Sequence, residues 1–293
     1  MTYIGRFAPS PTGPLHLGSV VAAAASYLDA RAHRGRWLVR IEDLDTGRCD
    51  PAAARNMIRT LEQLGMVPDE PVVWQSRRLA TYEEALSALN RCGVLYPCAC
   101  TRAQVRRRAP HPGVYAGTCR QGLPPDTRPR SLRVRLDTPS DQFTDRFAGP
   151  QHSKQGIDFG DPVVRRADGS VAYVLAGAVD DVVSGVTDVV RGDDLLPTTA
   201  TQRLLLGLLG MTPPRYAHIP VVLGADGRKL SKQNHAPPVD TTAPTRVLRD
   251  TFDLLGLPHD VTKRAANMPL AALWEAGVQA WRDQLRPAAP TSL

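Results

Sequence analysis

Lysine is scarce in this chain of 293 residues, because only four of its 36 basic residues are lysine and the rest are arginine. An arginine bias can reflect the coding composition of a genome. The formal net charge of +7 and the pI near 9.4 therefore count only in part as signs of a polyanionic partner such as nucleic acid. The placement of the lysines is more informative, since Lys229 and Lys232 fall within one pentapeptide. A cation on a mobile stem has a specific use there.

The sequence also lacks any apolar run long enough to span a membrane, and no charged and then apolar leader opens it. We therefore expect a cytoplasmic protein without a membrane partner, and we expect it to be a monomer. Its five cysteines, an odd number, do not resemble a disulfide framework. The hydrophobic fraction of 42% over this length is enough for one large core with smaller appendages.

The most informative stretch of the sequence is residues 3–34. Apolar residues 3–8 predict a buried strand, a loop of Pro, Ser, Thr and Gly follows, and an Ala-rich run predicts a helix over 18–34. A loop between a strand and a helix N-terminus suits phosphate, because free backbone N–H groups and the positive end of the helix dipole point at the anion. His16 can donate to phosphate oxygens there, and Gly18 leaves room for a flat group. The alternative is a loop that only caps an ordinary helix.

A second strand is predicted over residues 36–42, which completes a β-α-β unit and therefore predicts a parallel sheet. Ligands bind beyond the carboxyl ends of the strands in such sheets. Arg6 and Glu42 both lie near such ends, although an ion pair at the sheet edge is the more common outcome for one charged pair. Further helices are predicted at residues 51–64, 78–91, 195–210, 244–256 and 270–285, and a further strand at 217–223.

Residues 96–130 differ from the rest, with several prolines and glycines and little periodicity. The thiols in this segment are Cys98, Cys100 and Cys119. A loop of this length without its own core needs a cross-link, and a structural zinc ion is the natural one in a reducing compartment. The fourth ligand is open on spacing alone, because His111 is the conventional choice and Tyr115 is uncommon for zinc. Unrelated cysteines in a short hairpin are the alternative.

The second half of the chain returns to apolar runs. Short antiparallel strands are predicted over 131–147, and Tyr173 and Arg191 stand beside apolar runs at the ends of predicted strands, where a structural role is more common than ligand binding. A glycine-rich turn at 224–227 then leads into the lysine pentapeptide. That arrangement predicts a mobile cationic clamp, with a solvated basic turn as the alternative.

Two motifs together resemble the signatures of class I aminoacyl-tRNA synthetases. PTGPLHLG at 11–18 resembles the HIGH signature, and KLSK at 229–232 resembles the KMSKS signature. Three flanking segments resemble the glutamyl subgroup of the family: RFAPSPTG at 6–13, RIEDLD at 40–45 and GVTDVVRGDDLL at 185–196. The likeness covers residues 3–255 in the order of the family.

The resemblance implies an α/β fold, a Rossmann-type class I synthetase catalytic domain with a small zinc-stapled insertion and a short helical C-terminal segment. We divide the chain accordingly. Residues 1–95 and 161–233 are expected to form the two halves of the catalytic domain. Residues 96–160 are expected to form the insertion and an acceptor-type subdomain, and residues 234–293 the helical segment.

Only about sixty residues follow Lys232, too few for the helical anticodon-binding domain of glutamyl-tRNA synthetases. The chain resembles a paralogue in this subgroup that activates glutamate and attaches it to the queuosine base in the anticodon of tRNA(Asp). That resemblance implies ATP, L-glutamate and queuosine-bearing tRNA(Asp) as partners, Mg²⁺ with ATP, and one structural Zn²⁺. The alternatives are a truncated synthetase that charges a tRNA 3′ end, a non-catalytic RNA-binding paralogue, and ligation of glutamate to another acceptor.

The resemblance also implies residue roles. The catalytic residues are His16 and Lys232. The glutamate pocket is implied to contain Arg6, Phe7, Ala8, Pro9, Ser10, Glu42, Tyr173 and Arg191, and the planar fork of Arg191 suits a side-chain carboxylate. The ATP site is implied to contain His16, Gly18, Ser19, Lys229, Ser231 and Lys232. The zinc ligands are implied to be Cys98, Cys100, Tyr115 and Cys119. Two departures from the motifs bear on rate: Ser19 replaces the second histidine of HIGH, and Gln233 replaces the final serine of KMSKS.

Overall fold

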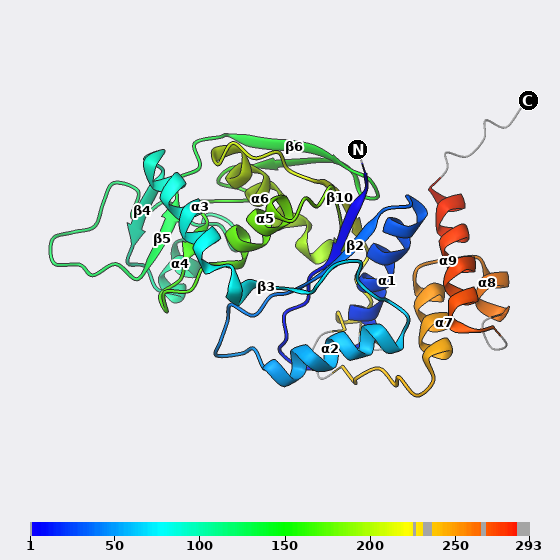
Figure 1. Cartoon of the computed structure of the whole chain (residues 1–293). Helices are drawn as coiled ribbons and strands as arrows, with labels where there is room; N and C mark the ends of the chain where they lie inside the picture. The colour runs from blue at the N-terminus through cyan, green and yellow to red at the C-terminus, as the bar shows by residue number, and fades with distance from the viewer. Residues whose placement is uncertain (1, 225–226, 231–235, 265–267, 286–293) are drawn as a thin grey trace, which may run out of the picture. The chain divides into compact units, whose positions relative to one another are not determined.

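A computed structural model describes residues 2–224, 227–230, 236–264 and 268–285 of the chain (Figure 1). The chain divides into two compact units. The first unit comprises the chain up to Trp74, Thr187–Asp193 and the chain from Ile219 onward, and the second unit comprises Gln75–Val186 and Asp194–His218. The four-part division proposed from the sequence stays a prediction.

A parallel sheet lies at the centre of the first unit. Strands β1 (Ile4–Phe7) and β2 (Arg36–Ile41) pair in parallel, and the short strand β3 (Val73–Trp74) adds to the other side of β2. Helix α1 (Leu17–Ala32) connects β1 to β2. Its alanines are buried, so the helix packs closely on the strands. The predicted β-α-β unit is therefore confirmed.

Strand β9 (Asp188–Gly192), from much later in the chain, lies beside β1 in this unit. The Thr187 backbone N–H donates to the Ile4 carbonyl at 2.9 Å, and the Ile4 N–H donates to Thr187 Oγ1 at 2.9 Å. Arg6 contacts the Val190 carbonyl further along the same strand. The contacts run in the same direction along both strands, so Arg6 and Arg191 fall toward the same edge of the sheet.

Helix α1 is also contacted by helices from the C-terminal part of the first unit. Helix α2 (Pro51–Gln63) begins at the predicted acidic N-cap followed by proline. The C-terminal helices are α7 (Pro244–Leu254), α8 (His259–Arg264) and α9 (Leu270–Gln284). Two tryptophans of α9 fix it in place. Trp281 Nε1 donates to the buried Asp29 carboxylate of α1 at 3.0 Å, and Trp274 Nε1 donates to the Leu64 carbonyl at 2.7 Å.

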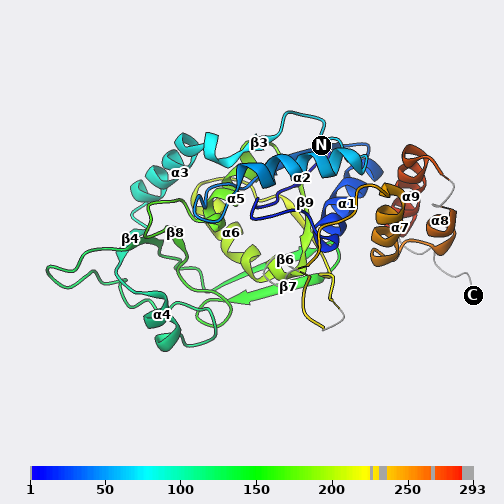
Figure 2. The same cartoon turned by 90° about the horizontal axis from the view of Figure 1, so that it is seen from below.

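The second unit combines short helices with antiparallel strands. Its helices are η1 (Gln75–Arg77), α3 (Leu79–Arg91), α4 (Arg102–Arg108), α5 (Tyr173–Val183), η2 (Asp193–Leu195) and α6 (Leu196–Leu208). Its strands are β4 (Leu95–Cys98), β5 (Ser131–Val134), β6 (Ser140–Asp145), β7 (Gly149–Lys154), β8 (Val163–Arg165) and β10 (Arg215–Ile219). Elements η2 and β10 lie at the unit's boundaries. Strands β4, β5 and β8 form one antiparallel sheet, and β6 and β7 form a hairpin (Figure 2).

One prediction about the second unit was wrong. The apolar run from Tyr173 forms helix α5, so Tyr173 begins a helix and does not end a strand. Its buried residues include Leu175, Ala176 and Val179, and this spacing of three and four places them on one helical face. The predicted strand over 217–223 is also shorter, because Pro220 has no N–H to continue a strand. Among the described residues, none of the helices is both long and apolar enough to cross a membrane.

Candidate active site and metal centre

The loop between β1 and α1 is fixed by backbone hydrogen bonds from the residue that follows β2 and from the N-cap of α2. The Glu42 N–H donates to the Pro9 carbonyl at 3.0 Å, and the Asp50 N–H donates to the Pro11 carbonyl at 2.8 Å. Gly13 adopts a φ of 148°, a conformation that favours glycine. The irregular loop is therefore held in a defined shape at the carboxyl ends of two parallel strands, where the sequence predicted a ligand site.

His16 is the N-cap of α1, and it is largely buried. Its Nδ1 accepts from the Ser19 N–H at 3.2 Å, and its Nε2 lies 3.0 Å from Ser19 Oγ. With Nδ1 accepting, the neutral imidazole carries its proton on Nε2 and can donate from there. Ser19, in the place of the second histidine of HIGH, thus orients the first one.

The two signature segments meet at the start of α1. A β-carbon at Gly18 would lie 3.3 Å from the His16 ring and 3.5 Å from Leu230 Cβ, so even an alanine there would fill this junction. Residues 222–224 pair in an antiparallel manner with residues 228–230, and the Leu230 N–H donates to the Val222 carbonyl at 2.8 Å. Leu230 belongs to the lysine pentapeptide, so the described start of the predicted clamp lies beside the predicted phosphate loop.

The chain beyond the pentapeptide contacts the same place. His16 forms an antiparallel bridge with Pro238, and the Val239 N–H donates to the Leu15 carbonyl at 3.1 Å. The start of α1 is therefore contacted both by Leu230 and by residues 238–239. Ser231 and Lys232, two of the predicted ATP-binding residues, lie outside the described residues. Lys229 is described and is exposed.

The predicted glutamate pocket gathers buried charge at the strand ends of the first unit. Arg6 and Arg191 are each only 5% exposed, and Arg6 Nη1 reaches the Val190 carbonyl at 3.5 Å. Glu42 is buried and pairs with Arg40 at 2.9 Å. Guanidinium groups and a carboxylate at these strand ends are the groups that a small ligand with two carboxylates and one amine requires.

The other predicted pocket residues differ in their exposure and location. Phe7 and Pro9 are buried, Ala8 is half-buried and Ser10 is exposed. These four residues offer mainly backbone groups to a ligand. Tyr173 belongs to the second unit, at the start of α5. Its predicted role in the pocket stays a prediction, as do the other assigned roles.

The three cysteines of the segment 96–130 form a sulfur cluster in the second unit. The sulfur atoms of Cys98, Cys100 and Cys119 all lie within 4.8 Å of one another. The Tyr115 hydroxyl oxygen lies 3.5 Å from Cys98 Sγ and 3.9 Å from Cys100 Sγ, and it accepts from the Cys119 N–H at 2.8 Å. Within the described part of the chain, no histidine joins the group, and His111 is exposed.

Arg133 ties this cluster to the antiparallel sheet. Its Nε donates to Cys98 Sγ at 3.3 Å, and its guanidinium carbon lies 3.7 Å from the centre of the Tyr115 ring. Its Nη1 donates to the Asp161 carbonyl at 2.6 Å. Gly160 allows the close approach behind the tyrosine, because a side chain there would lie 2.7 Å from the Tyr115 carbonyl oxygen.

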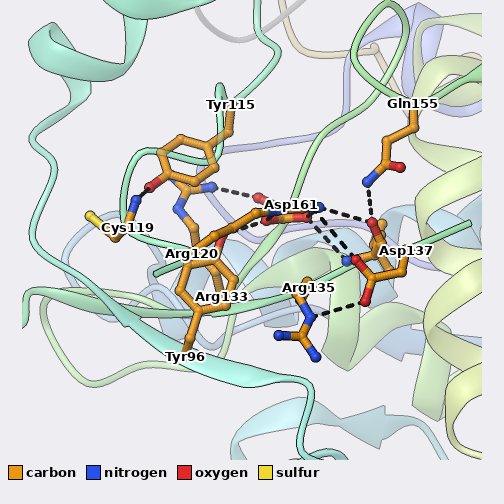
Figure 3. A network of polar contacts seen from close by, with 10 residues as sticks. Tyr96, Tyr115, Cys119, Arg120, Arg133, Arg135, Asp137, Gln155 and Asp161 are labelled. Carbon is orange, nitrogen blue, oxygen red and sulfur yellow. Dashed lines mark hydrogen bonds and ion pairs between the residues drawn. The ribbon is translucent and has the colours of Figure 1, made fainter. Parts of the chain in front are cut away.

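A network of polar contacts holds Asp161 in turn (Figure 3). Its carboxylate accepts from the Tyr96 hydroxyl at 2.5 Å and from two nitrogens of Arg120 at 2.5 Å. Burial, followed by the Asp161 carboxylate, raises the pKa of Tyr96 well above its ordinary value, so the hydroxyl stays a donor. This support was not predicted from the sequence, because both arginines stand in the expected insertion whereas Asp161 directly follows it.

The electrostatics of the cluster favour a metal ion. Burial alone would raise the pKa of the Cys98 thiol, but hydrogen bonds with Tyr115 and Arg133 lower it to about 7. Burial and the hydrogen bond with Cys119 raise the pKa of Cys100. A cation among the sulfurs would stabilise all the thiolates together. Three sulfurs, two of them on buried cysteines, with a phenol oxygen alongside form a donor set that fits zinc better than Mg²⁺ or Ca²⁺.

Comparisons with known proteins give this geometry a context. The family model for "tRNA synthetases class I (E and Q), catalytic domain" matches residues 4–246. Over 301 aligned residues the chain is 50% identical to the glutamyl-Q tRNA(Asp) synthetase of Cupriavidus metallidurans, covering 99% of this chain and 96% of that protein. It is 48% identical over 298 residues to the protein of the same name from Bordetella bronchiseptica, covering 99% and 92%.

Solved structures agree with this result. The crystal structure of a glutamate tRNA ligase from Elizabethkingia meningosepticum, in complex with its amino acid, is similar with a TM-score of 0.72 and 26% identity. The match covers 86% of this chain, which spans 60% of that longer one. The predicted class I synthetase fold is therefore confirmed.

Proposed function

We propose, from the premise that this chain belongs to the glutamyl-Q tRNA(Asp) synthetases of the class I glutamate and glutamine group, that it activates L-glutamate with ATP and transfers it to the queuosine base in the anticodon of tRNA(Asp). The observation that carries the activation step is the contact between the two signature segments, where Leu230 faces Gly18 at the start of α1. The names and coverage of the relatives support the choice of acceptor.

The first step joins glutamate to AMP. The α-carboxylate of glutamate attacks the α-phosphorus of ATP, which enters as its Mg²⁺ complex, and pyrophosphate leaves. Negative charge spreads over the phosphoryl oxygens in the transition state, so the protein works by positioning and electrostatics. We assign those oxygens to the N-terminus of α1 and to the imidazole of His16, whose Nε2 lies 3.0 Å from Ser19 Oγ.

The lysine pentapeptide supplies the positive charge for the leaving pyrophosphate. Leu230 lies against Gly18, so Lys229 and Lys232 flank a residue already at the nucleotide site. We assign closure over the triphosphate to Lys232, with Lys229 and Ser231 contributing to ATP binding. One such cation lowers the barrier by about 3 kcal/mol, if its effect equals that of an oxyanion donor.

Glutamate is recognised at both of its ends. Glu42, held by Arg40, accepts from the α-amino group, and the backbone of residues 7–10 borders the α-carboxylate. Arg191 takes the side-chain carboxylate through its two-pronged guanidinium group, with Arg6 as the neighbouring cation and Tyr173 completing the pocket. The pocket thus selects an amino acid with a second carboxylate.

The second step forms an ester. A hydroxyl of the queuosine cyclopentenediol attacks the activated carbonyl carbon, the bond to the AMP phosphate breaks, and the hydroxyl proton leaves with that phosphate. The adenylate is already reactive, so the step needs no strong base. We place the enzyme in the cytoplasm, where glutamate and tRNA are made. We propose that it acts as a monomer.

The sulfur cluster is the proposed zinc centre, with Cys98, Cys100 and Cys119 as ligands and Tyr115 as the fourth. When bound, zinc supplies a structural cross-link for a segment with little apolar core. The hydroxyl group of Tyr115 can be tested alone, since Tyr115→Phe keeps the ring that stacks on Arg133. We expect this variant to bind zinc roughly 10- to 100-fold more weakly. His111→Ala is the control, and the reverse order of effects would assign the fourth position to the histidine.

Two assays test the function. Glutamate-dependent exchange between ATP and pyrophosphate is expected without tRNA, and labelled glutamate is expected to reach tRNA(Asp) only when queuosine is present. Absence of exchange would point to a non-catalytic RNA-binding protein. Label on tRNA(Glu) would point to a synthetase that charges the 3′ end, and exchange without label on any tRNA would point to another acceptor.

A further inference from the structure

The positive charge of this chain is concentrated in one short segment. Residues 101–130 contain seven arginines and one acidic residue, Asp126, so they carry six of the seven net positive charges of the whole protein. A genome-wide preference for arginine would spread the charge along the chain. The net excess of positive charge is instead found almost entirely in the segment around the sulfur cluster, so this excess calls for a local explanation.

Six of these seven arginines, which share one exposed segment of the chain, are together called the arginine face. They are Arg102, Arg106, Arg107, Arg108, Arg128 and Arg130. All six are exposed, and within the described part of the chain none of them forms an ion pair. The seventh, Arg120, is committed to Asp161. The face is therefore available to an external anion without first breaking a contact inside the protein.

Four of the six arginines stand on α4, a helix that is firmly held. Thr101 and Gln104 form a reciprocal capping box at its start, with hydrogen bonds of 3.2 and 2.8 Å. Val105 packs on the cluster of Tyr96, Cys98, Tyr115 and Cys119, so the arginines around it point outward. The charges are thus presented by a fixed element, and a partner need not order it on binding.

A purely structural role does not account for the pattern. Cations in the last turn of a helix stabilise its dipole, which explains one of Arg106, Arg107 and Arg108. Three consecutive arginines repel one another, and a single one would serve the dipole. Arg128 and Arg130 lie outside any helix. An external polyanion explains all six positions together.

We propose that the arginine face is a docking surface for the phosphate backbone of the tRNA substrate. The proposal rests on the proposed function, because it takes tRNA as the partner. Guanidinium groups pair with phosphate oxygens in a bidentate manner, and such contacts position a nucleic acid without reading its sequence. The arginine face therefore sets affinity and orientation, and recognition of queuosine is left to the catalytic site.

The test compares two full-length variants with equal loss of charge. One carries R102Q, R106Q, R107Q and R108Q on α4. The matched control carries R55Q, R59Q, R91Q and R246Q, four exposed arginines on other helices. Binding to queuosine-bearing tRNA(Asp) is measured over a range of salt, and glutamate-dependent ATP–pyrophosphate exchange without tRNA serves as the folding check.

We expect the α4 variant to bind tRNA on the order of a hundredfold more weakly at 0.1 M salt, with unchanged exchange. The slope of log affinity against log salt should fall by about 3, because each lost phosphate contact removes about 0.7 to 0.9. The control variant should lose less than about threefold in affinity. These results together would establish the surface.

Equal loss in both variants, or no loss in the α4 variant, overturns the surface and leaves the enzyme assignment intact. Wild-type protein that neither binds tRNA nor transfers glutamate overturns the surface and the proposed function together. Vesicles of phosphatidylserine and phosphatidylcholine form a second arm. If the α4 substitutions weaken vesicle binding and leave tRNA binding unchanged, the arginine face serves an anionic membrane and the proposal is wrong.

Discussion

The β1–α1–β2 segment and the cysteine segment 96–130 are held together in different ways. The first is a regular β-α-β unit whose interior residues, such as Val20, Leu28 and Trp37, are almost fully buried. The second contains one short helix and a long irregular loop, and its buried cluster consists of two tyrosines and two cysteines. The nucleotide site is thus built by backbone hydrogen bonds and apolar burial. The cysteine segment depends on a few polar groups and on the metal ion that we propose they hold.

The largest expected effect removes one sulfur from the cluster. Cys98→Ser should abolish zinc binding and destabilise the segment by about 5 kcal/mol or more, because little apolar burial remains to hold it. Zinc content and limited proteolysis within 96–130 measure this. Cys92→Ser is the matched control, since that thiol is exposed and lies outside the cluster. A Cys98→Ser protein with full zinc and unchanged proteolysis would remove the distinction between the two regions.

Next in size is the loss of the glutamate-binding cation. Arg191→Ala should lower kcat/KM for glutamate about a thousandfold, because two charge-assisted hydrogen bonds are lost, while the KM for ATP changes little. Arg191→Lys keeps the charge without the planar fork, so its kcat/KM for glutamate should lie between the values of the wild type and Arg191→Ala. Steady-state exchange kinetics with each substrate varied give both constants. Parallel loss for ATP and glutamate would contradict the assignment.

His16 has two roles, and two substitutions separate them. Both His16→Ala and His16→Asn should reduce exchange about a hundredfold, because each removes the imidazole donor. Only His16→Ala should also cost about 1 kcal/mol of stability, since asparagine is a good N-cap. Exchange rates and denaturant unfolding measure the two effects. If His16→Asn keeps full activity, the residue acts only as a cap.

The smallest effect concerns an anchor of α1. Asp69 accepts from Arg31 at 2.7 Å and from the Trp37 N–H at 2.6 Å. Burial alone would raise the pKa of Asp69, but the hydrogen bonds from Arg31 and Trp37 hold that pKa below its ordinary value. Its stabilisation is therefore present above about pH 4 and is lost as the pH falls through the lower folded pKa.

Asp69→Asn should accordingly cost less than about 1 kcal/mol at neutral pH. The difference from wild type should shrink below about pH 4, and chemical unfolding at several pH values checks this. A difference that grows on acidification would have the wrong sign. Apolar burial stabilises α1 without Asp69, so we expect a small effect here. The loss of a zinc ligand is expected to have a much larger one.

The regular segment was more predictable from the sequence than the irregular one. Periodicity and capping residues located α1 and α2 to within two residues, because local signals and tertiary packing agree there. Arg133 shows why the cysteine segment was harder. It stands between Leu132 and Val134 in a predicted strand, and it is buried because Cys98, the Tyr115 ring and Asp161 give it partners. Such partners come from distant segments and leave no local pattern.

The contact between Gly18 and Leu230 could likewise not be predicted from the spacing of residues along the sequence. Leu230 lies beside Gly18 where residues 222–224 pair with residues 228–230, and only the joint resemblance to two family signatures predicted that residues 18 and 230 belong to one site. Residue types indicated the chemistry of the site. The packing that orients His16 through Ser19 required the three-dimensional structure.

The position of glutamate on the tRNA tests the central claim most directly. Queuosine-bearing tRNA(Asp) is labelled with radioactive glutamate and ATP, digested with a guanosine-specific ribonuclease, and its fragments are separated. Label is predicted in the anticodon-loop fragment alone, and tRNA(Asp) without queuosine should stay unlabelled. Label in the 3′-terminal fragment, or equal labelling of both tRNAs, would contradict transfer to the anticodon base.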